Sequence, residues 1–375
     1  MISSLSSECF IYSLIMRKGD LETYFECWDD AFQILNQFYR GKNITHSLDV
    51  HGLVLGQFLK LIESESDMIK VSFLIHYLNW KSGNELSVDL EGYTPISDGR
   101  VGDYSSLNVT HEQVGIEALN DTVVIKLNGG LGTTMGCDGP KSLIEIDGKD
   151  TFLDEFFQQI HTLESNYGKS IHKVLFNSFY THDAIVTHVS EGCDCVVQSK
   201  YPRINSEKGT PFEGASDLSN WYPPGHGDLF LTLFNTPLID TWLEQGKKYA
   251  FVSNVDNLGA TFDPKILGFM IQEKLNFLME VTEKLDSDKK GGILAERDGR
   301  LSLLEIAQIR SDQVGLFQNT DLFPYFNTNN IWIDLTVLKK YKNFEWLGAL
   351  EYPDKVREYL TEIDIYALVS GIDMS

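Results

Sequence analysis

The stretch VVIKLNGGLGTTMGCDGPKSLIEI at residues 123–146 carries the strongest structural signal in the sequence. An apolar, β-branched run is followed by five glycines within eleven residues, and the glycine run ends at Pro140 and Lys141. Glycine permits positive φ angles and a close approach of the backbone to a ligand, so that several N–H groups can converge on phosphate oxygens. The stretch therefore predicts a strand, a phosphate-binding turn and a lysine that adds a positive charge to the turn.

Two common phosphate-binding loops do not match this stretch. A Walker loop has glycine directly before its lysine, whereas here Pro140 precedes Lys141. The dinucleotide fingerprint G-x-G-x-x-G also fails, because Gly130, Gly132 and Gly136 are spaced one residue too far apart. On the glycines alone, a tight turn between a strand and a helix that binds no ligand is an alternative interpretation.

Short β-branched runs alternate with helical stretches from residue 122 onward. We expect strands at residues 122–127, 173–178, 195–199, 249–254 and 277–282, and helices at 151–168 and 227–246. This alternation is typical of an α/β fold with a mostly parallel, doubly wound (Rossmann-like) sheet and helices on both faces. Ligands of such sheets bind beyond the carboxyl ends of the strands, which is where the glycine-rich and polar turns of this sequence lie.

The length of 375 residues exceeds that of a single small core, so we expect several segments. Residues 1–110 are predicted to form a helical N-terminal region that ends in a connecting segment at 86–110. Residues 111–335 are predicted to form the α/β domain, and residues 336–375 a C-terminal tail.

Charge and composition exclude several classes of protein. The formal net charge of −23 argues against a nucleic-acid or anionic-membrane surface, because such surfaces need clustered Lys and Arg. No secretory signal or membrane-spanning run is expected. The five cysteines lack the spacing of a zinc site and are expected to be reduced thiols, which predicts a cytoplasmic protein. Cys193 and Cys195 alternate and are expected to share one face of a strand.

The complete string KLNGGLGTTMGCDGPKS at residues 126–142 resembles the nucleotide-binding signature of the UDP-glucose pyrophosphorylases. Further blocks resemble that family in the same order along the chain, up to Trp332. These blocks are QSKYPRI (198–204), WYPPGHGDLF (221–230), SNVDNLGAT (253–261), MEVTEK (279–284), KGG (290–292), LLEIAQ (303–308) and FNTNNIW (326–332).

The resemblance implies a nucleotidyltransferase that makes UDP-glucose and pyrophosphate from UTP and glucose 1-phosphate with Mg²⁺. It implies two catalytic lysines, Lys141 and Lys290, and Asp256 as the metal ligand. The implied UTP site consists of Leu127, Asn128, Gly129, Gly130, Lys141, Gln198, Gly225, Asn254 and Asp256. The implied sugar-phosphate site consists of Gly129, Gly130, His226, Asn254, Gly292, Glu305, Asn329 and Asn330.

Several of these residue types suit the roles that the resemblance implies. Gln198 would hydrogen-bond the uracil edge, because a carboxamide offers both a donor and an acceptor. Asp256 suffices as a single carboxylate, because Mg²⁺ usually takes one or two and completes its octahedron with water and phosphate oxygens. Glu305 can accept hydrogen bonds from sugar hydroxyl groups. A polar strand end at Gln198 and a buried paired carboxylate at Glu305 are the alternative structural interpretations.

The resemblance weakens after Trp332. The family's second active-site lysine in a Pro-Val-Lys segment and its C-terminal β-helix are not recognisable, and no role is assigned to Lys339, Lys340, Lys342 or Lys355. Three hypotheses follow. The chain is an active uridylyltransferase for glucose 1-phosphate, a pyrophosphorylase for another sugar 1-phosphate, or a binding-only regulatory relative. The sequence does not identify a subunit partner or an oligomeric state.

Overall fold

The computed structural model describes residues 54, 57–58, 60–81, 88–97, 99, 101–132, 136, 139–146, 148–189, 192–285, 288–289, 291–297, 299–342 and 365–369. The chain divides into two compact units. Unit 1 combines Met1–Leu86, Gln198–Ile239 and Lys339–Leu360, and unit 2 combines Ser87–Val197, Asp240–Leu338 and Thr361–Ser375. The division into three consecutive domains stays a prediction, because most of the expected N-terminal helical region and of the tail lies outside the described residues.

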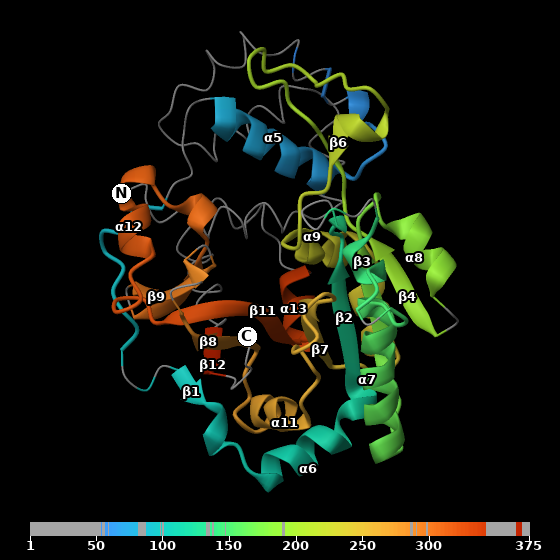
Figure 1. The fold of residues 1–375 in the computed structure, drawn as a ribbon, viewed down its shortest axis with the longest axis vertical. Coiled ribbons are helices and arrows are strands. Elements are labelled where there is room, and N and C mark those ends of the chain that lie inside the picture. The colour runs from blue at the N-terminus through green and yellow to red at the C-terminus, as the bar shows by residue number, and fades with distance from the viewer. Residues whose placement is uncertain are drawn as a thin grey trace. The chain divides into compact units, whose positions relative to one another are not determined.

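Unit 2 is built on a mixed sheet that has ten strands among the described residues (Figure 1). The strand order is β1-β12-β8-β11-β7-β2-β3-β4, and a β9–β10 hairpin joins β11. The strands are β1 (Val101–Asp103), β2 (Thr122–Asn128), β3 (His172–Asn177), β4 (Cys193–Val197), β7 (Tyr249–Asn254), β8 (Phe277–Glu283), β9 (Ile293–Arg297), β10 (Arg300–Leu304), β11 (Tyr325–Asp334) and β12 (Ile365–Val369).

The expected mostly parallel sheet is confirmed, with one addition. Strand β2 runs parallel to β3 and β7, and β8 runs parallel to β12. Strand β11 is antiparallel to both β7 and β8, which the sequence pattern did not indicate. The register pairs Leu127 with Asn254 and Asn128 with Asn177, so β2, β3 and β7 end at the same edge of the sheet.

Helices alternate with the strands of unit 2 and also occur in unit 1 among the described residues. They are α5 (Asp67–Lys81), α6 (Val109–Glu117), α7 (Phe152–Tyr167), α8 (His182–His188), α9 (Asp228–Asn235), α10 (Leu238–Glu244), α11 (Pro264–Gln272), α12 (Val314–Phe317) and α13 (Leu335–Lys342). Short 3₁₀ helices occur at Tyr104–Ser106, Leu119–Asp121, Lys141–Leu143, Leu218–Asn220, Ile306–Gln308 and Ser311–Gln313. Helix α7 begins with a capping box between Thr151 and Asp154 and ends at Gly168, which has a φ of +61°.

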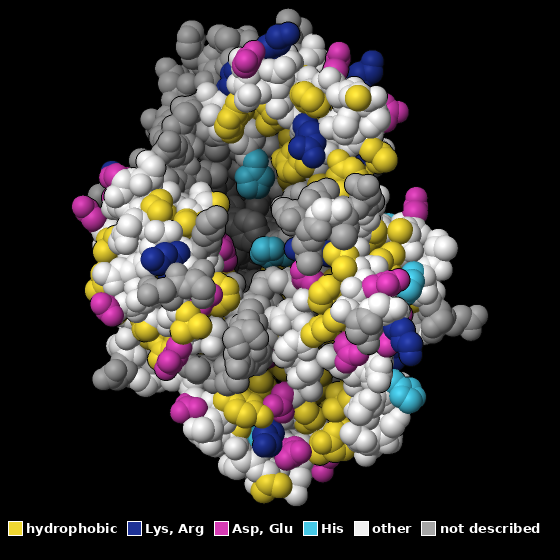
Figure 2. Space-filling model, viewed as in Figure 1, with side chains coloured by type: hydrophobic (Ala, Val, Ile, Leu, Met, Phe, Trp, Pro, Cys, Tyr) yellow, Lys and Arg dark blue, Asp and Glu magenta, His cyan; other side chains and the backbone are white. Residues whose placement is uncertain are grey.

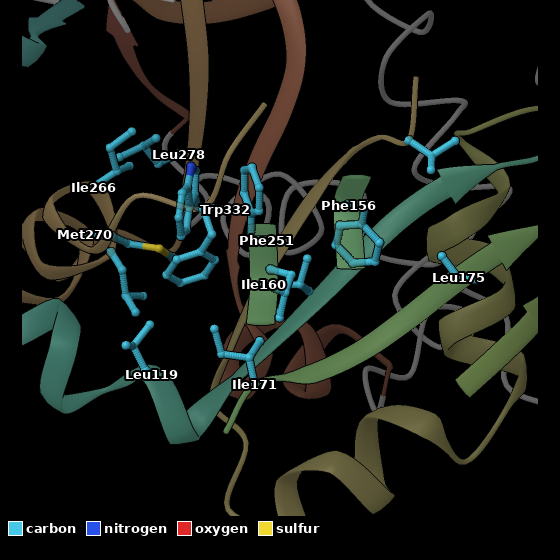
Figure 3. Packing of buried hydrophobic residues seen from close by; sticks show 14 of the residues in the cluster. Leu119, Phe156, Ile160, Ile171, Leu175, Phe251, Ile266, Met270, Leu278 and Trp332 are labelled. Atoms are coloured by element: carbon cyan, nitrogen blue, oxygen red, sulfur yellow. The ribbon is translucent and has the colours of Figure 1, made fainter. Parts of the chain in front are cut away.

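The core of unit 2 lies between the sheet and its helices (Figure 3). Phe156 and Ile160 of α7 belong to the same buried cluster as Phe251 of β7 and Trp332 of β11, and the rings of Phe251 and Trp332 lie 4.3 Å apart. Successive residues of β2 from Val123 to Ile125 are fully buried although they point to opposite faces. Both faces of β2 are therefore covered, as a doubly wound sheet requires.

Three expectations about element boundaries need correction. The strand expected at 195–199 is β4 at Cys193–Val197, because Gln198 and Ser199 leave the sheet. The helix expected at 227–246 divides into α9 and α10 on either side of Thr236 and Pro237, since proline has no backbone N–H to continue the helix. The connecting segment at 86–110 also packs: Val88 bridges Ile309 and is 1% exposed.

The shared face of Cys193 and Cys195 is confirmed, because both side chains pack against the same core cluster. Both thiols are free.

Unit 1 holds an aromatic cluster around Tyr201 of the two-stranded ribbon β5 (Tyr201–Pro202) and β6 (Trp221–Tyr222). The Tyr201 ring contacts Phe73 of α5 and Tyr222 at centroid distances of 5.7 and 5.8 Å. The Tyr201 hydroxyl donates to Ser72 Oγ of α5 at 2.7 Å. These contacts fix α5 against the segment that follows Gln198.

The described surface agrees with the acidic composition. In Figure 2 the Lys and Arg side chains of the described residues stand apart from one another among Asp and Glu side chains, and they form no broad basic patch on this face. Among the helices that the structure describes, none combines the length and the apolar content that a bilayer crossing needs.

Candidate functional site

The glycine-rich loop after β2 folds back on itself and places Lys141 beside Gly130. Leu131 bridges Pro140 in antiparallel fashion, and the Lys141 N–H donates to the Gly130 carbonyl at 3.0 Å. The Gly132 N–H donates to the Gly139 carbonyl at 2.8 Å. Residues 133–135, 137 and 138 at the tip of the loop lie outside the described residues. The expected association of glycine backbone and lysine therefore exists within the described part of the loop.

The turn between β3 and α8 supports the start of this loop. Thr181 Oγ1 donates to the Asn128 carbonyl at 2.9 Å, and Ser178 Oγ donates to the Gly129 carbonyl at 2.8 Å. Asn128 is buried, and its Nδ2 donates to Asn177 Oδ1 at 2.9 Å. Its Oδ1 is also buried and has no hydrogen-bond partner among the described residues. Asn177, Ser178 and Thr181 were not among the candidate residues, because no glycine or charge pattern marks them in the sequence.

Asp256 follows β7 and lies next to the glycine-rich loop. Its Oδ2 is 3.3 Å from Lys141 Nζ, and the two side chains are 34% and 32% exposed. The Val255 N–H donates to the Leu127 carbonyl at 3.1 Å. This hydrogen bond holds the residue before Asp256 against the end of β2. The carboxylate and the ammonium group are thus adjacent and both accessible to a ligand.

Asn254 and Asn329 join the end of β7 to β11. Asn329 Nδ2 donates to Asn254 Oδ1 at 2.9 Å. Asn329 has a φ of +60°, an uncommon angle for a residue other than glycine, and lies where the β8–β11 pairing shifts register between Asn327 and Asn330. Irregular backbone of this kind is frequent next to functional sites.

Asn330 points into the protein, unlike Asn329. It is 0% exposed, and its Nδ2 lies 3.4 Å from Glu280 Oε2. Glu280 is also buried and accepts a 2.7 Å hydrogen bond from Trp332 Nε1. Glu280 was not among the candidate residues, although it lies in the MEVTEK block. The proposed sugar contact of Asn330 stays a prediction, and its observed partner is Glu280.

Gly292 and Glu305 are in close contact. A Cβ atom on Gly292 would lie 2.4 Å from Glu305 Oε1, so any larger residue would displace the carboxylate. The Gly292 carbonyl accepts from the Asn327 N–H at 3.0 Å, which links this pair to β11. Glu305 also exchanges capping hydrogen bonds with Gln308. Lys290, the second proposed catalytic lysine, lies outside the described residues.

Lys126 is a second lysine near the loop and was not among the candidate residues. It is 3% exposed, and its Nζ donates to Ser253 Oγ at 2.7 Å and to the Ala260 carbonyl at 3.0 Å. Burial lowers the pKa of Lys126 to about 7, against the opposing effect of the Glu280 and Asp256 carboxylates. A lysine within the otherwise apolar strand TVVIKL was the signal that could have marked it.

Unit 1 carries the other candidates, Gln198, Gly225 and His226. Gln198 Oε1 accepts from the Gly225 N–H at 3.1 Å, and Gly225 has a φ of +102°. Because the Gln198 oxygen is engaged, its Nε2 is the end that can meet a ligand, as a donor. His226 is exposed, and its carbonyl accepts from the Leu229 N–H at 3.1 Å.

Asp228 supports this second group and was not a candidate. It is 5% exposed, and its Oδ2 accepts from the Ser199 N–H at 2.6 Å and from Thr232 Oγ1 at 3.0 Å. Its Oδ1 is buried without a partner in the described part of the chain. Burial raises the pKa of Asp228 to about 6, although the hydrogen bonds from Ser199 and Thr232 act in the opposite direction.

The structure therefore gathers the proposed residues into two groups, one in each unit. In unit 2 the contacts form three pairs, which are Lys141 with Asp256, Asn254 with Asn329, and Gly292 with Glu305. In unit 1, Gln198 directly follows the last residue of β4, and Gly225 and His226 lie in the loop before α9.

A metal ion would have one carboxylate ligand in this arrangement. Among the described residues no cluster of three or more His, Cys, Asp or Glu side chains could hold a metal ion. Asp256 nevertheless offers an accessible hard oxygen donor, and Mg²⁺ in phosphate-transfer sites takes its remaining ligands from water and phosphate. The residues present fit Mg²⁺ that arrives with a nucleotide, whereas they do not form a cage for a resident metal.

Comparison with known proteins supports the family resemblance. Residues 72–351 match the profile of a family described as UTP–glucose-1-phosphate uridylyltransferase, so the match extends beyond the blocks found by inspection. A UTP–glucose-1-phosphate uridylyltransferase from Hordeum vulgare is 42% identical over 292 residues, which cover 75% of this chain.

Solved structures give the same result. A UDP-glucose phosphorylase from Trypanosoma brucei is 33% identical, with a TM-score of 0.70 over 76% of this chain. A UDP-glucose pyrophosphorylase variant from Leishmania major, solved in complex with UDP-glucose, is 31% identical, with a TM-score of 0.69 over 77% of this chain.

The matched region is shorter than these relatives, since it spans 62% of the barley protein and 64% of each solved chain. It nevertheless includes every block on which the resemblance rests. The chain belongs to the UTP–glucose-1-phosphate uridylyltransferase family.

Proposed function

We propose that this chain makes UDP-glucose and pyrophosphate from UTP and glucose 1-phosphate in the cytoplasm. The observation that carries the proposal is the pair of Lys141 and Asp256, 3.3 Å apart beside the glycine-rich loop. An accessible ammonium group can contact phosphate oxygens directly, and an accessible carboxylate can bind a metal ion that contacts them. The names of the barley and Leishmania relatives support the choice of UTP, glucose 1-phosphate and UDP-glucose.

The reaction is an in-line displacement at the α-phosphorus of UTP. A phosphate oxygen of glucose 1-phosphate forms the new P–O bond, the bond from the α-phosphorus to the bridging oxygen breaks, and pyrophosphate leaves with that electron pair. A phosphate monoester has a second pKa of about 6, so the attacking group is largely ionised at neutral pH. No side chain has to remove a proton, and the chain contributes mainly by positioning and charge stabilisation.

The residues of unit 2 would hold the phosphates and the sugar. We assign Lys141 and the backbone of Gly129 and Gly130 to the phosphates, and Asp256 to Mg²⁺. When bound, Mg²⁺ would neutralise negative charge on the phosphate oxygens. We further assign Leu127 and Asn128 to the wall of the nucleotide site, a role that Asn128 fits through its buried, unpaired Oδ1.

The sugar side is assigned to residues that the family resemblance implies, and contacts in unit 2 support four of them, which are Asn254 with Asn329 and Gly292 with Glu305. Glu305 can accept hydrogen bonds from sugar hydroxyl groups, and Asn254 with Asn329 supplies both donors and acceptors. We retain His226, Gly292 and Asn330 on this side, with Lys290 as the second catalytic lysine.

The base contact is assigned to Gln198 and Gly225. With Oε1 bonded to the Gly225 N–H, Gln198 offers its Nε2 donor, which suits the O4 acceptor of uracil. Cytosine carries an amino donor at the same position, so the same arrangement would disfavour CTP. The geometry of this pair thus supports a uridine nucleotide as substrate.

The test is pyrophosphate release from UTP, glucose 1-phosphate and Mg²⁺, with each component omitted in turn. UTP binding is measured by calorimetry on the same preparation. Release that requires all three components supports the proposal. UTP binding without release would support a binding-only relative instead, and faster release with galactose 1-phosphate or an N-acetylhexosamine 1-phosphate would indicate a different sugar. The absence of both binding and release would reject the proposal.

A further inference from the structure

The loop between β7 and α11, residues 255–263, carries Asp256 and is held by side chains from two other elements. Lys126 Nζ of β2 donates to the Ala260 carbonyl at 3.0 Å. Gln159 Nε2 of α7 donates to the Leu258 carbonyl at 3.2 Å. The loop itself contains turns and no helix or strand, so these two side chains replace the restraint that regular backbone pairing would give.

The environment of Lys126 is unfavourable for an amine, so a contribution to stability does not explain why a lysine is present. The side chain is 3% exposed, and its Nζ lies 5.4 Å from the Phe156 ring centroid and 5.9 Å from that of Phe251. Strands β2 and β7 already pair through their backbones. Burying an amine is unfavourable, and replacing buried charged groups with apolar residues is often neutral or stabilising. The amine is therefore better explained by what it binds, the Ser253 hydroxyl and the Ala260 carbonyl.

Gln159 lines a cavity of about 300 Å³ that the loop also borders. Lys126, Gln159 and Ala260 all line this cavity, together with the apolar side chains of Phe156 and Phe251. A backbone carbonyl is a strong hydrogen-bond acceptor, and the Gln159 carboxamide provides the donor for that of Leu258. The two hydrogen bonds thus act on carbonyls two residues apart in the same loop.

We propose that Lys126 and Gln159 are positioning residues that hold the 255–262 loop, and with it Asp256, in the geometry required for the nucleotide-bound metal. The inference rests on the proposed role of Asp256. A preorganised carboxylate needs no rearrangement when the ligand binds, and loss of such order weakens both metal binding and transition-state stabilisation.

Hydrogen–deuterium exchange of the free protein tests the first half of this inference. The Val255 N–H, the Ala260 N–H and the Thr261 N–H are hydrogen-bonded and report on opening of the loop. In Lys126→Met and in Gln159→Leu, exchange of the amides at 255–262 should become about fivefold faster, as expected for the loss of one hydrogen bond.

Two matched variants serve as controls. Lys173→Met removes a lysine of neighbouring β3 that donates to Glu164 and to the Ile171 carbonyl. Gln158→Leu changes the exposed neighbour of Gln159, which lines the same cavity but makes no side-chain hydrogen bond to the loop among the described residues. Neither should change exchange at 255–262. Unchanged exchange in both test variants, or an equal increase in β2 and β3, would overturn the inference. If Lys126→Met does not fold, Gln159→Leu carries the test.

The second half is tested by calorimetric UTP binding at varied Mg²⁺. Both test variants should need several-fold more Mg²⁺ for half-maximal UTP binding, whereas the controls should match the wild type. An unchanged Mg²⁺ requirement together with faster loop exchange would overturn the link to Asp256. Failure of the wild type to bind UTP would reject the proposed function, while the exchange experiment would still decide whether the two side chains hold the loop.

Discussion

Two aspartates, one in each unit, lie next to the candidate binding residues in opposite environments. Asp256 of unit 2 is 34% exposed and pairs with Lys141. Asp228 of unit 1 is 5% exposed, and its Oδ2 accepts hydrogen bonds from the Ser199 N–H and from Thr232. Residue type and local position do not separate them, because Asp256 lies in a turn and Asp228 directly follows one. The two aspartates differ in the exposure of the side chain and in the group that contacts the carboxylate.

The difference indicates a division of labour. A partly exposed carboxylate whose partner is a partly exposed lysine can exchange that partner for a ligand at little cost. A buried carboxylate that accepts a backbone N–H fixes the chain, and here it fixes the residue after Gln198. We therefore expect changes at Asp256 to affect chemistry and changes at Asp228 to affect stability and geometry.

The largest effect is expected for Asp256→Asn. The variant keeps the size of the side chain but lacks the charge that would bind Mg²⁺. We expect kcat for pyrophosphate release to fall by about 10²–10³, the range observed when a charge-stabilising group is removed from an active site. The measurement is steady-state kinetics at saturating UTP and glucose 1-phosphate.

Asp194→Asn is the matched control, since Asp194 is an exposed carboxylate that lies 3.0 Å from a His172 nitrogen on the neighbouring strand. It should leave kcat unchanged. Equal losses in both variants would indicate a general effect of acidic charge, and full activity of Asp256→Asn would remove the distinction between the two aspartates.

A somewhat smaller effect is expected for Gln198→Glu. One carboxylate oxygen can still accept from the Gly225 N–H, but the other end becomes an acceptor that faces the O4 acceptor of uracil. We expect affinity for UTP to fall by about 100-fold, because an unpaired polar group in a binding site is strongly unfavourable. Calorimetry with UTP and CTP measures the change.

The CTP titration sharpens the result. A fall for UTP with an unchanged or improved affinity for CTP would establish Gln198 as a base-reading donor. Equal losses for both nucleotides would show that the residue only supports the loop, and Gln158→Glu, on the exposed face of α7, controls for added charge.

Much of the unit 2 edge could be predicted from the sequence. The ends of β2 and β7 agree with the predicted strands to within one residue, and the turns that follow them carry Gly129, Gly130 and Asp256 as expected. Local signals are sufficient there, because apolar strand residues and glycine turns are determined by short stretches of chain. The family resemblance then ordered these turns into one site.

The rest depends on contacts between distant residues. The antiparallel direction of β11 follows from pairing with β7 and β8, which no local pattern encodes. Thr181 and Ser178 support the glycine-rich loop from another strand end, and a buried Asp228 at the start of α9 has the same local signal as any acidic helix start. Burial and hydrogen-bond partners of such residues appear only when the chain is folded.

Asp228, the buried aspartate, should make the free energy of unfolding depend on pH. The pKa of Asp228 is raised from 3.8 to about 6 in the folded protein, so its folded form binds a proton more tightly than its unfolded form. Its contribution is therefore most favourable below about pH 4 and is lost as the pH rises through about 6. In Asp228→Asn, the free energy of unfolding relative to wild type should shift by about 2 kcal/mol in favour of the variant between pH 4 and pH 7.

Urea unfolding at several pH values measures this shift, and Asp154→Asn provides a control of opposite sign. Burial tends to raise the pKa of Asp154, but hydrogen bonds from Thr151 and the contact with His188 lower it overall. That carboxylate stabilises the fold at neutral pH and loses its effect as the pH falls. A flat pH difference between wild type and Asp228→Asn would contradict the raised pKa of Asp228.

The smallest effect is expected at Asn329, whose left-handed φ of +60° lies beside the Asp256 edge. Asn329→Gly relieves the backbone but removes the 2.9 Å hydrogen bond to Asn254, so stability should change by less than about 1 kcal/mol. Lys274→Gly, at a φ of +55° after α11, relieves the same strain without any site contact and should stabilise the protein slightly. If Asn329 holds Asn254 for the sugar phosphate, KM for glucose 1-phosphate should rise about fivefold in Asn329→Gly alone. An equal KM for glucose 1-phosphate in the two glycine variants would show that the backbone angle at Asn329 serves the fold and not the sugar-phosphate site. The position of Asp256 would then depend on Lys126 and Gln159, which bind the other end of its loop.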